Sequence, residues 1–298
     1  MAAPTKTTKA STARMSVPKT YKLYIGGKFP RSESGRSFEL LDTKGGFLAN
    51  VSLASRKDAR DAVTAARKAF GGWSKATAYN RGQVLYRIAE VLDARRDQFI
   101  SELVATGSTQ RAAETEIDAA VATWVFYAGF ADKYAQVVGA ANPVAAPYFN
   151  FSLPEPTGVV AIVSPDPANW SLRGLAATIA PAIVAGNTTV VVARERNPLS
   201  AISFAEVLAT SDVPGGVVNL LTGDACELAP HLAMHMDVNA IDLAGCPDAE
   251  FARELEVHAA ENLKRVVRPR SFGPRHTGTL DEITNFIELK TVWHPIGV

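Results

Sequence analysis

Cysteine is scarce in this sequence of 298 residues, which holds only Cys226 and Cys246. That number excludes a disulfide-stapled scaffold and favours a reducing compartment. An excess of one charge is also missing, because 31 lysines and arginines oppose 30 aspartates and glutamates, and this balance argues against a nucleic-acid-binding protein. No apolar run approaches the roughly 20 residues that span a bilayer, and no apolar stretch typical of a secretory signal stands near the N-terminus. We therefore expect a cytoplasmic protein with no nucleic-acid or membrane partner.

Apolar residues are plentiful, at 47% of the chain against 20% charged residues, so a sizeable core is expected. Residues 1–18 differ from the rest because they are small, polar and basic. Their composition predicts a disordered tail. An address or docking peptide is the alternative, and no spacing in the tail chooses between such roles.

The N-terminal half predicts a short strand pair followed by three helices. Tyr21–Ile25 alternates in polarity, and Phe38–Leu41 is expected to pair with it. Ser55 and Asp58 have the spacing of a capping box, which starts a helix that we expect to stop at Gly71 and Gly72. Apolar residues at helical spacing, which include aromatic residues expected in the core, predict two further helices over residues 80–104 and 111–137.

From Gly158 onward, short β-branched runs alternate with helical stretches. Such an array demands right-handed crossovers and a mostly parallel sheet, so we predict an α/β fold with a Rossmann-like domain. The predicted strands are Val159–Val163, Thr188–Val192, Val217–Leu221, Ala240–Leu243 and Lys264–Val267, and the helices between them are Ser171–Ala185, Leu199–Thr210, Ala225–Met234 and Asp248–Asn262.

The last part of the chain predicts a loop over residues 268–283 and an edge or interface strand over Asn285–Trp293. The whole chain then divides into a disordered tail, a helical part of the cofactor-type domain, a strand for oligomerisation, the Rossmann-like domain, a linker and a C-terminal oligomerisation strand. These segments cover residues 1–18, 19–142, 143–157, 158–267, 268–283 and 284–298.

Four segments resemble the aldehyde dehydrogenase superfamily in order and spacing: Glu155–Val159, Ile179–Asn187, Pro198–Ala201 and Val213–Gly223. The resemblance runs with interruptions from about Leu23 to Val266. It implies a Rossmann-like cofactor domain, a catalytic domain that carries a nucleophilic cysteine, and a small sheet for oligomerisation.

The sequence departs from that family where the chemistry would lie. In the family, the segment that resembles Asn262–Val266 leads into Glu-Leu-Gly-Gly-Lys, whose glutamate is the general base, whereas here Pro269 falls near the glutamate. Residues 268–283 then stand where a catalytic domain should follow. The resemblance therefore implies an internal deletion of the catalytic domain, and we assign no catalytic residue.

The cofactor positions that the resemblance implies are only partly kept. Asn169 matches the family's oxyanion-stabilising amide, and Gly223 and Gly245 match family glycines. Cys246 stands where the family has serine, and Ala193 stands where it has the lysine that contacts the adenosine ribose. We therefore expect either no cofactor or weak NAD(P) binding at a degenerate set of Asn169, Gly223, Gly245 and Cys246.

Other candidate sites have ordinary alternatives. Cys246 at a helix N-terminus could be a reactive nucleophile, but without a second domain we interpret it as a small turn residue. His231 and His235 are four residues apart and could bind a metal, but no acidic ligand stands at metalloprotease spacing, which favours a solvated helix face and no metal site. A basic cluster could meet an acidic partner or simply be a solvated loop; its members are Arg265, Arg268, Arg270, Arg275 and His276.

The leading hypothesis is a catalytically inactive member of the superfamily that serves in assembly or regulation, with itself or a full-length aldehyde dehydrogenase as partner. The kept assembly strands motivate it, because an edge strand has unpaired backbone groups. The alternatives are an NAD(P)-dependent aldehyde oxidoreductase and a nucleotide-binding sensor. The expected interface residues are Tyr148, Phe149, Phe151, Ile287, Leu289 and Val292.

Overall fold

The computed structural model describes residues 17–165, 171–193, 198–272 and 277–297. Its body is built on a five-stranded parallel sheet in the order β10-β9-β6-β7-β8, as predicted for a Rossmann-like domain. The predicted strands are confirmed to within a residue at each end. They are β6 (Val159–Val163), β7 (Thr188–Ala193), β8 (Val218–Thr222), β9 (Ala240–Asp242) and β10 (Arg265–Val267).

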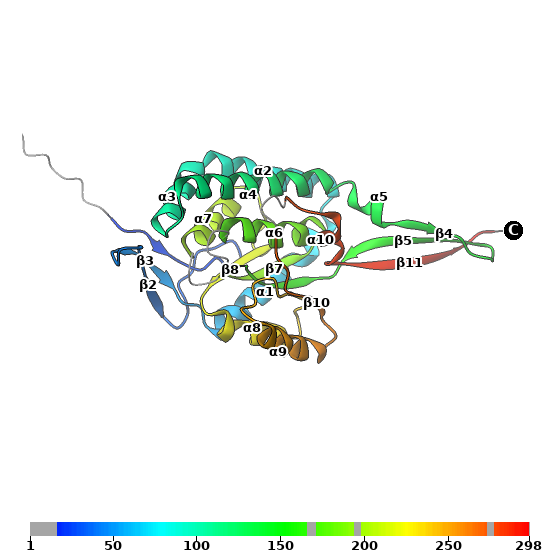
Figure 1. The fold of residues 1–298 in the computed structure, drawn as a ribbon. Coiled ribbons are helices and arrows are strands. Elements are labelled where there is room, and N and C mark those ends of the chain that lie inside the picture. Colours follow the sequence, from blue (N-terminus) through cyan, green and yellow to red (C-terminus); the bar gives the residue numbers. More distant parts are fainter. Residues whose placement is uncertain (1–16, 166–170, 194–197, 273–276, 298) are drawn as a thin grey trace, which may run out of the picture.

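Helices cover both faces of this sheet, which explains why β6 and β7 are buried along their whole length and carry β-branched residues on both sides (Figure 1). One face is covered by α2 (Ala78–Ala94), α4 (Gln110–Phe130), α6 (Ser171–Val184) and α7 (Pro198–Ala209), with α3 (Arg96–Ala105) beside them. The other face is covered by α1 (Arg56–Lys75), α8 (Ala225–Met234) and α9 (Ala249–Ala260).

The first helix, α1, begins as predicted and ends later than predicted. The Ser55 side chain accepts from the Asp58 amide, and the Asp58 carboxylate accepts in return from the Ser55 amide, so the capping box is confirmed. The expected stop at Gly71 and Gly72 is wrong. The helix continues because Trp73 is buried and its indole donates to the carbonyl of Ile183 at 2.9 Å, which ties the last turn to α6.

The two helices expected over residues 80–104 and 111–137 are each divided in the structure. The first is split near Arg95 into α2 and α3, and the second ends at Phe130 before a short α5 (Tyr134–Val138). Their aromatic face is core, as expected: Trp124 is fully buried and stacks on Phe204 of α7 at 5.6 Å.

The N-terminal strands form a small sheet in the order β1-β3-β2, with β1 at Thr20–Tyr21, β2 at Ser37–Leu41 and β3 at Phe47–Ser52. The expected direct pairing of Tyr21–Ile25 with Phe38–Leu41 is wrong, because β3 lies between them. The neighbouring Tyr24 instead bridges to Leu220 of β8, which joins this segment to the edge of the large sheet.

A three-stranded arm projects from the body, and we name it the arm sheet (Figure 1). It consists of β4 (Ala140–Asn142), β5 (Tyr148–Pro156) and β11 (Ile287–Pro295), in the order β11-β5-β4. Antiparallel pairing from Ile287 opposite Pro156 to Pro295 opposite Tyr148 confirms that the C-terminal strand joins the segment near Tyr148.

The expectation that residues 268–283 form only a loop is wrong in its last part, where α10 (Leu280–Thr284) begins. Thr279 and Glu282 form a capping box there, a local signal that the count of prolines, glycines and arginines in the segment concealed. Ile283 and Phe286 are fully buried in the main core, so the segment just before the arm sheet belongs to the body.

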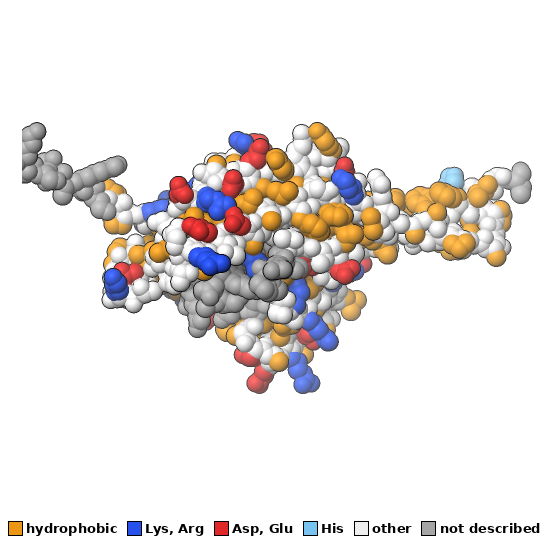
Figure 2. All heavy atoms as spheres, turned by 45° about the horizontal axis from the view of Figure 1, so that its top comes forward, with side chains coloured by type: hydrophobic (Ala, Val, Ile, Leu, Met, Phe, Trp, Pro, Cys, Tyr) orange, Lys and Arg blue, Asp and Glu red, His pale blue; other side chains and the backbone are white. Residues whose placement is uncertain are grey.

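Apolar side chains gather on the arm sheet and over α2 and α4 on the face that Figure 2 shows. In the part of the chain that the structure describes, every helix is too short or too polar to cross a bilayer.

Candidate functional site

The carboxyl edge of the parallel sheet is the place where this fold binds ligands, at the point where the chain reverses its direction of strand addition. Here the chain adds β7 and β8 on one side of β6 and then crosses to place β9 and β10 on the other side. The switch point therefore lies between β6 and β9, where Asp242, the last residue of β9, stands opposite Ile162.

Gly245 approaches the end of β6 closely. Its amide donates to the carbonyl of Val163 at 2.9 Å, and a Cβ atom at this position would lie 2.0 Å from the carbonyl oxygen of Ser164. Any other residue would collide with backbone that cannot yield. Packing within the chain therefore accounts for glycine at this position.

An ion pair stands directly beside Gly245. Arg270 donates from both terminal nitrogens to the two carboxylate oxygens of Asp242, at 2.7 and 2.9 Å, and the Asp242 side chain is fully buried. The Asp242 carboxylate also accepts from the amide of Ala244 at 3.0 Å, which shapes the turn after β9. Sequence analysis missed this pair, although an aspartate that ends an otherwise apolar strand is an available signal.

A second carboxylate fills the N-terminus of α6, the helix that follows β6. Glu116 on α4 is buried, and its Oε1 accepts from the amide of Leu172 at 2.7 Å and from the hydroxyl of Ser171 at 3.5 Å. Burial raises the pKa of Glu116 to about 7, although the hydrogen bonds from the first turn of α6 and the nearby Arg173 oppose this shift. Nothing in the spacing along α4 marked Glu116 out, because the contact depends on how α4 packs on α6.

The N-terminus of α9 is also occupied by an acid of this chain. Asp248 caps the helix, and its carboxylate accepts from the amide of Phe251 at 2.8 Å. Helix N-termini attract anions through unpaired N–H groups, so a phosphate at either α6 or α9 would meet a carboxylate already in place. At the end of β7, Ala193 has no group that could donate a hydrogen bond.

The structure brings together only some of the residues expected to bind a cofactor. Gly245 and the half-buried Cys246 lie in the turn after β9, whereas Gly223 follows β8, with β6 and β7 between the two strands. Asn169 lies outside the described residues. Gly223 and Gly245 thus follow different strands at the same edge of the sheet, and the expected set stays a prediction.

The other candidates occupy separate places. His231 lies in the last turn of α8 and His235 caps its C-terminus, and burial lowers the pKa of both. Among the described residues, no group of three or more histidine, cysteine, aspartate or glutamate side chains could hold a metal ion. The described arginines of the basic cluster bind separate acids: Arg265 binds Glu288, Arg268 binds Glu256 and Arg270 binds Asp242; Arg275 and His276 lie outside the described residues.

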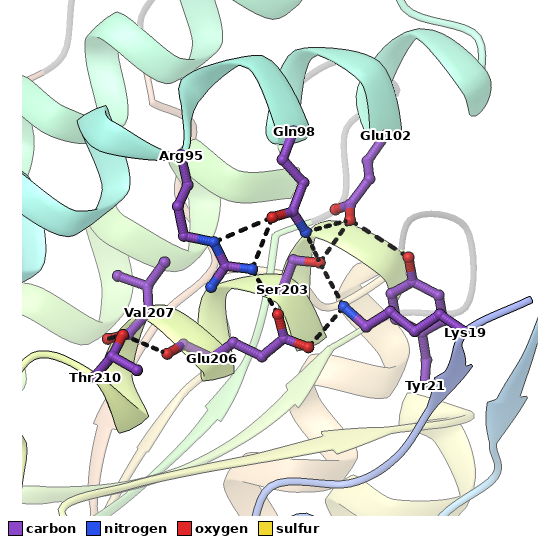
Figure 3. A network of polar contacts seen from close by, with 9 residues as sticks. All are labelled: Lys19, Tyr21, Arg95, Gln98, Glu102, Ser203, Glu206, Val207 and Thr210. Atoms are coloured by element: carbon purple, nitrogen blue, oxygen red, sulfur yellow. Dashed lines mark hydrogen bonds and ion pairs between the residues drawn. The ribbon is translucent and has the colours of Figure 1, made fainter. Parts of the chain in front are cut away.

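A further polar network ties the N-terminal strand β1 to α3 and α7 (Figure 3). Glu206 binds Lys19 at 2.6 Å and Arg95 at 2.5 Å, and these two cations lower the pKa of Glu206 although its burial opposes the shift. Glu102 accepts from Ser203 at 2.6 Å and Tyr21 at 3.4 Å. These hydrogen bonds and ion pairs connect β1 to α3 and α7, which makes the network an anchor for β1.

The sequence matches a known protein family over most of its length. The sequence pattern of the aldehyde dehydrogenase family matches residues 31–268, which include the five-stranded sheet and its helices. The chain belongs to the aldehyde dehydrogenase family.

Curated relatives in this family are longer than the chain. It is 33% identical over 263 residues to the cytosolic 10-formyltetrahydrofolate dehydrogenase of Mus musculus, which covers 85% of this chain and 28% of that protein. It is 33% identical over 251 residues to the mitochondrial benzaldehyde dehydrogenase of Antirrhinum majus, with 82% of this chain and 46% of that protein covered. The chain thus spans less than half the length of these two aldehyde dehydrogenase relatives.

Solved structures show the same relationship. The NAD+ complex of an aldehyde dehydrogenase from Bacillus cereus superposes with a TM-score of 0.77 and 27% identity, over 83% of this chain and 50% of that one. HpcC from Thermus thermophilus gives a TM-score of 0.79 and 30% identity, over 86% and 48% of the two chains. In this family member, Glu116 and Asp248 accept hydrogen bonds from amides at the N-termini of α6 and α9.

Proposed function

We propose that this chain is an aldehyde dehydrogenase-family subunit without dehydrogenase chemistry of its own, which acts by assembly with a second copy or with a full-length aldehyde dehydrogenase. We further propose that it does so in the cytoplasm. The observation that carries the proposal is the arm sheet, which projects from the body (Figure 1). Its strand register and exposed residues place apolar side chains on both of its faces, and Figure 2 shows apolar side chains on one of them.

One face of the arm sheet, which we name the tryptophan face, carries Leu289, Trp293 and Tyr148. Strand pairing places Tyr148 two residues along from the partner of Trp293, and the two rings lie edge to face at 5.8 Å. Leu289 and Trp293 are 57% and 58% exposed. Large apolar side chains so exposed on a projecting sheet favour burial against another chain.

The opposite face, the phenylalanine face, carries Phe149, Phe151 and Leu153, with Val292 across from Phe151. The rings of Phe149 and Phe151 lie 5.3 Å apart, and Phe149 and Leu153 are about half exposed. Ile287 was expected in this interface, but that expectation is wrong: Ile287 is only 4% exposed because it packs in the core of the body.

The connection from the body to the arm sheet supports the same proposal. Residues 268–286 lead from β10 to β11 through the short α10, and Pro269 stands near the position of the family's general base. Proline has no ionisable side chain, so it cannot accept a proton there. The described segment builds an attachment for the arm sheet and supplies no base at this position.

Light scattering on purified chains tests the proposal. Deletion of residues 284–298 would remove the buried Phe286 and Ile287, so point substitutions on exposed positions are sharper. We expect the wild type to show a multiple of the monomer mass, alone or after mixing with a full-length aldehyde dehydrogenase. Leu289→Ser with Trp293→Ser should lower that mass, and Phe149→Ser with Leu153→Ser should do so through the other face.

Lys57→Ser is the matched control, because Lys57 is exposed on α1 of the body, away from the arm sheet, and forms only a surface ion pair with Glu33 at 3.1 Å. It should leave the mass unchanged. A wild type that stays monomeric both alone and in the mixture would contradict the assembly proposal, and so would unchanged assembly in both double variants.

A further inference from the structure

Asp242 is placed where a ligand would enter the fold. It ends β9 and stands opposite Ile162 of β6, so its side chain lies at the switch point between the two strands. The side chain is fully buried. A buried carboxylate is costly unless a cation and hydrogen bonds accompany it, so Asp242 requires a cationic partner at this position.

That partner comes from the segment after β10. Arg270 reaches Asp242 with two parallel hydrogen bonds, and its guanidinium lies 5.1 Å from the centre of the Phe272 ring, which is itself buried. Burial opposes the charge of Arg270, but the carboxylates of Asp242 and Glu282 outweigh it and raise the arginine's pKa. The guanidinium is therefore held as a cation at the switch point.

We infer that Arg270 is a positioning residue whose bidentate pair with Asp242 fixes residues 268–272 against the turn after β9, so that an arginine of this chain stands at the switch point where ligands approach folds of this kind. This role is independent of assembly, because neither Asp242 nor Arg270 belongs to the arm sheet. It also differs from a loss of cofactor contacts, because it concerns a contact that this chain makes within itself.

The same segment makes further contacts with the body at Gly278 and Glu282. The Tyr127 hydroxyl on α4 donates to the carboxylate of Glu282 on α10. Gly278 has a φ of +122° and passes so close to α4 that a Cβ atom would lie 2.7 Å from the Phe126 ring. The contacts of Arg270 with β9 and of Glu282 with α4 hold the two described parts of this segment against the body.

A nearby ion pair of this segment is exposed to solvent. Arg268 binds Glu256 of α9 at 3.0 Å, but the Arg268 side chain is 80% exposed. Such a pair contributes little, because water screens it. Arg268 and Arg270 are thus two arginines two residues apart, of which only Arg270 binds a buried acid.

The two cysteines allow a direct test by thiol modification. Cys246 follows the turn that the Asp242 carboxylate shapes through Ala244, and its thiol reports on that turn. Cys226 is exposed on α8 and serves as the internal standard in the same molecule. The test uses the full chain with iodoacetamide, and mass spectrometry follows the rate at each cysteine.

Asp242→Ala combined with Arg270→Ala removes both charges, so that neither is left buried alone. We expect Cys246 in this variant to react on the order of tenfold faster than in the wild type, because the turn opens more often, with Cys226 unchanged. Arg270→Lys keeps the charge but loses the paired bonds, and should give an intermediate rate. Arg268→Ala is the matched control and should leave both rates as in the wild type.

An unchanged Cys246 rate in the folded double variant would overturn the inference, and so would an equal increase from Arg268→Ala. If circular dichroism shows that the double variant does not fold, Arg270→Lys decides. A faster Cys246 rate with unchanged Cys226 supports the inference in that case, and a wild-type rate overturns it.

Discussion

The side-chain amide of Asn187 joins the body to Phe286, the last residue before the arm sheet. It donates to the Phe286 carbonyl at 2.8 Å and to the carbonyl of Ala182 at 2.9 Å, while its oxygen accepts from the amide of Gly158 at 2.8 Å. The Asn187 side chain is fully buried. One amide thus links the end of α6, the start of β6 and the base of β11.

Asn187→Ala should destabilise the chain by roughly 2–5 kcal/mol, because it leaves two buried carbonyls and one buried amide without this partner. Urea unfolding monitored by circular dichroism measures the change. Gln110→Ala removes an exposed amide on α4 that bonds Glu114, and should change the free energy of unfolding by less than about 0.5 kcal/mol. Equal effects of the two substitutions would show that the buried contacts of Asn187 stabilise the chain no more than the exposed amide of Gln110 does.

The isolated chain should show no aldehyde dehydrogenase turnover. The resemblance to the family places Pro269 near the general base, and the carboxyl edge of the sheet holds the Asp242–Arg270 pair. The measurement is the absorbance of reduced cofactor with several aldehydes and either NAD or NADP, against a heat-killed control. Turnover that disappears in Cys246→Ser would refute the prediction and would make Cys246 the nucleophile.

Binding of NAD should be weak or absent. Ala193 at the end of β7 cannot supply the charge-assisted hydrogen bond of a lysine, a loss of about 1.5–3 kcal/mol or roughly 10- to 100-fold in affinity. Calorimetry with NAD measures the affinity, and Ala193→Lys should tighten any binding that the wild type shows. Low-micromolar binding by the wild type would contradict this expectation.

The fold of the body was predictable because its signals are local. Runs such as Val159–Val163 are apolar throughout and mostly β-branched, which marks buried parallel strands, and Ser55 with Asp58 marks a helix start. The end of α1 was not predictable, because Trp73 reaches a carbonyl 110 residues away. The position of β3 between β1 and β2 depends likewise on pairing between segments.

The candidate site was less predictable than the fold. Gly245 was found from its resemblance to a family glycine, but its neighbours Asp242 and Arg270 are 28 residues apart and carry no shared motif. Glu116 reaches α6 only because α4 packs on it, so its spacing along α4 gives no warning. Contacts that tertiary packing creates leave no mark on local periodicity.

Glu116 should make the stability of the chain depend on pH. Its pKa is about 7 in the folded chain, because burial disfavours the charged form, against an ordinary value of 4.5. Between these two values the folded state keeps a proton that the unfolded state releases, so the free energy of unfolding falls as the pH rises from 4.5 to 7. The fall amounts to about 3 kcal/mol and is complete above the folded pKa.

Glu116→Gln removes the titration while its side-chain oxygen can still accept from the Leu172 amide. The variant should therefore lose little stability between pH 5 and pH 8, whereas the wild type loses most of the pH-dependent contribution, as urea unfolding at both pH values would show. Glu114→Gln, at an exposed position on the same helix, is the matched control and should follow the wild type. Parallel pH profiles for Glu116→Gln and the wild type would contradict the assignment, because they would mean that Glu116 carries the same charge in the folded and unfolded chains over this range.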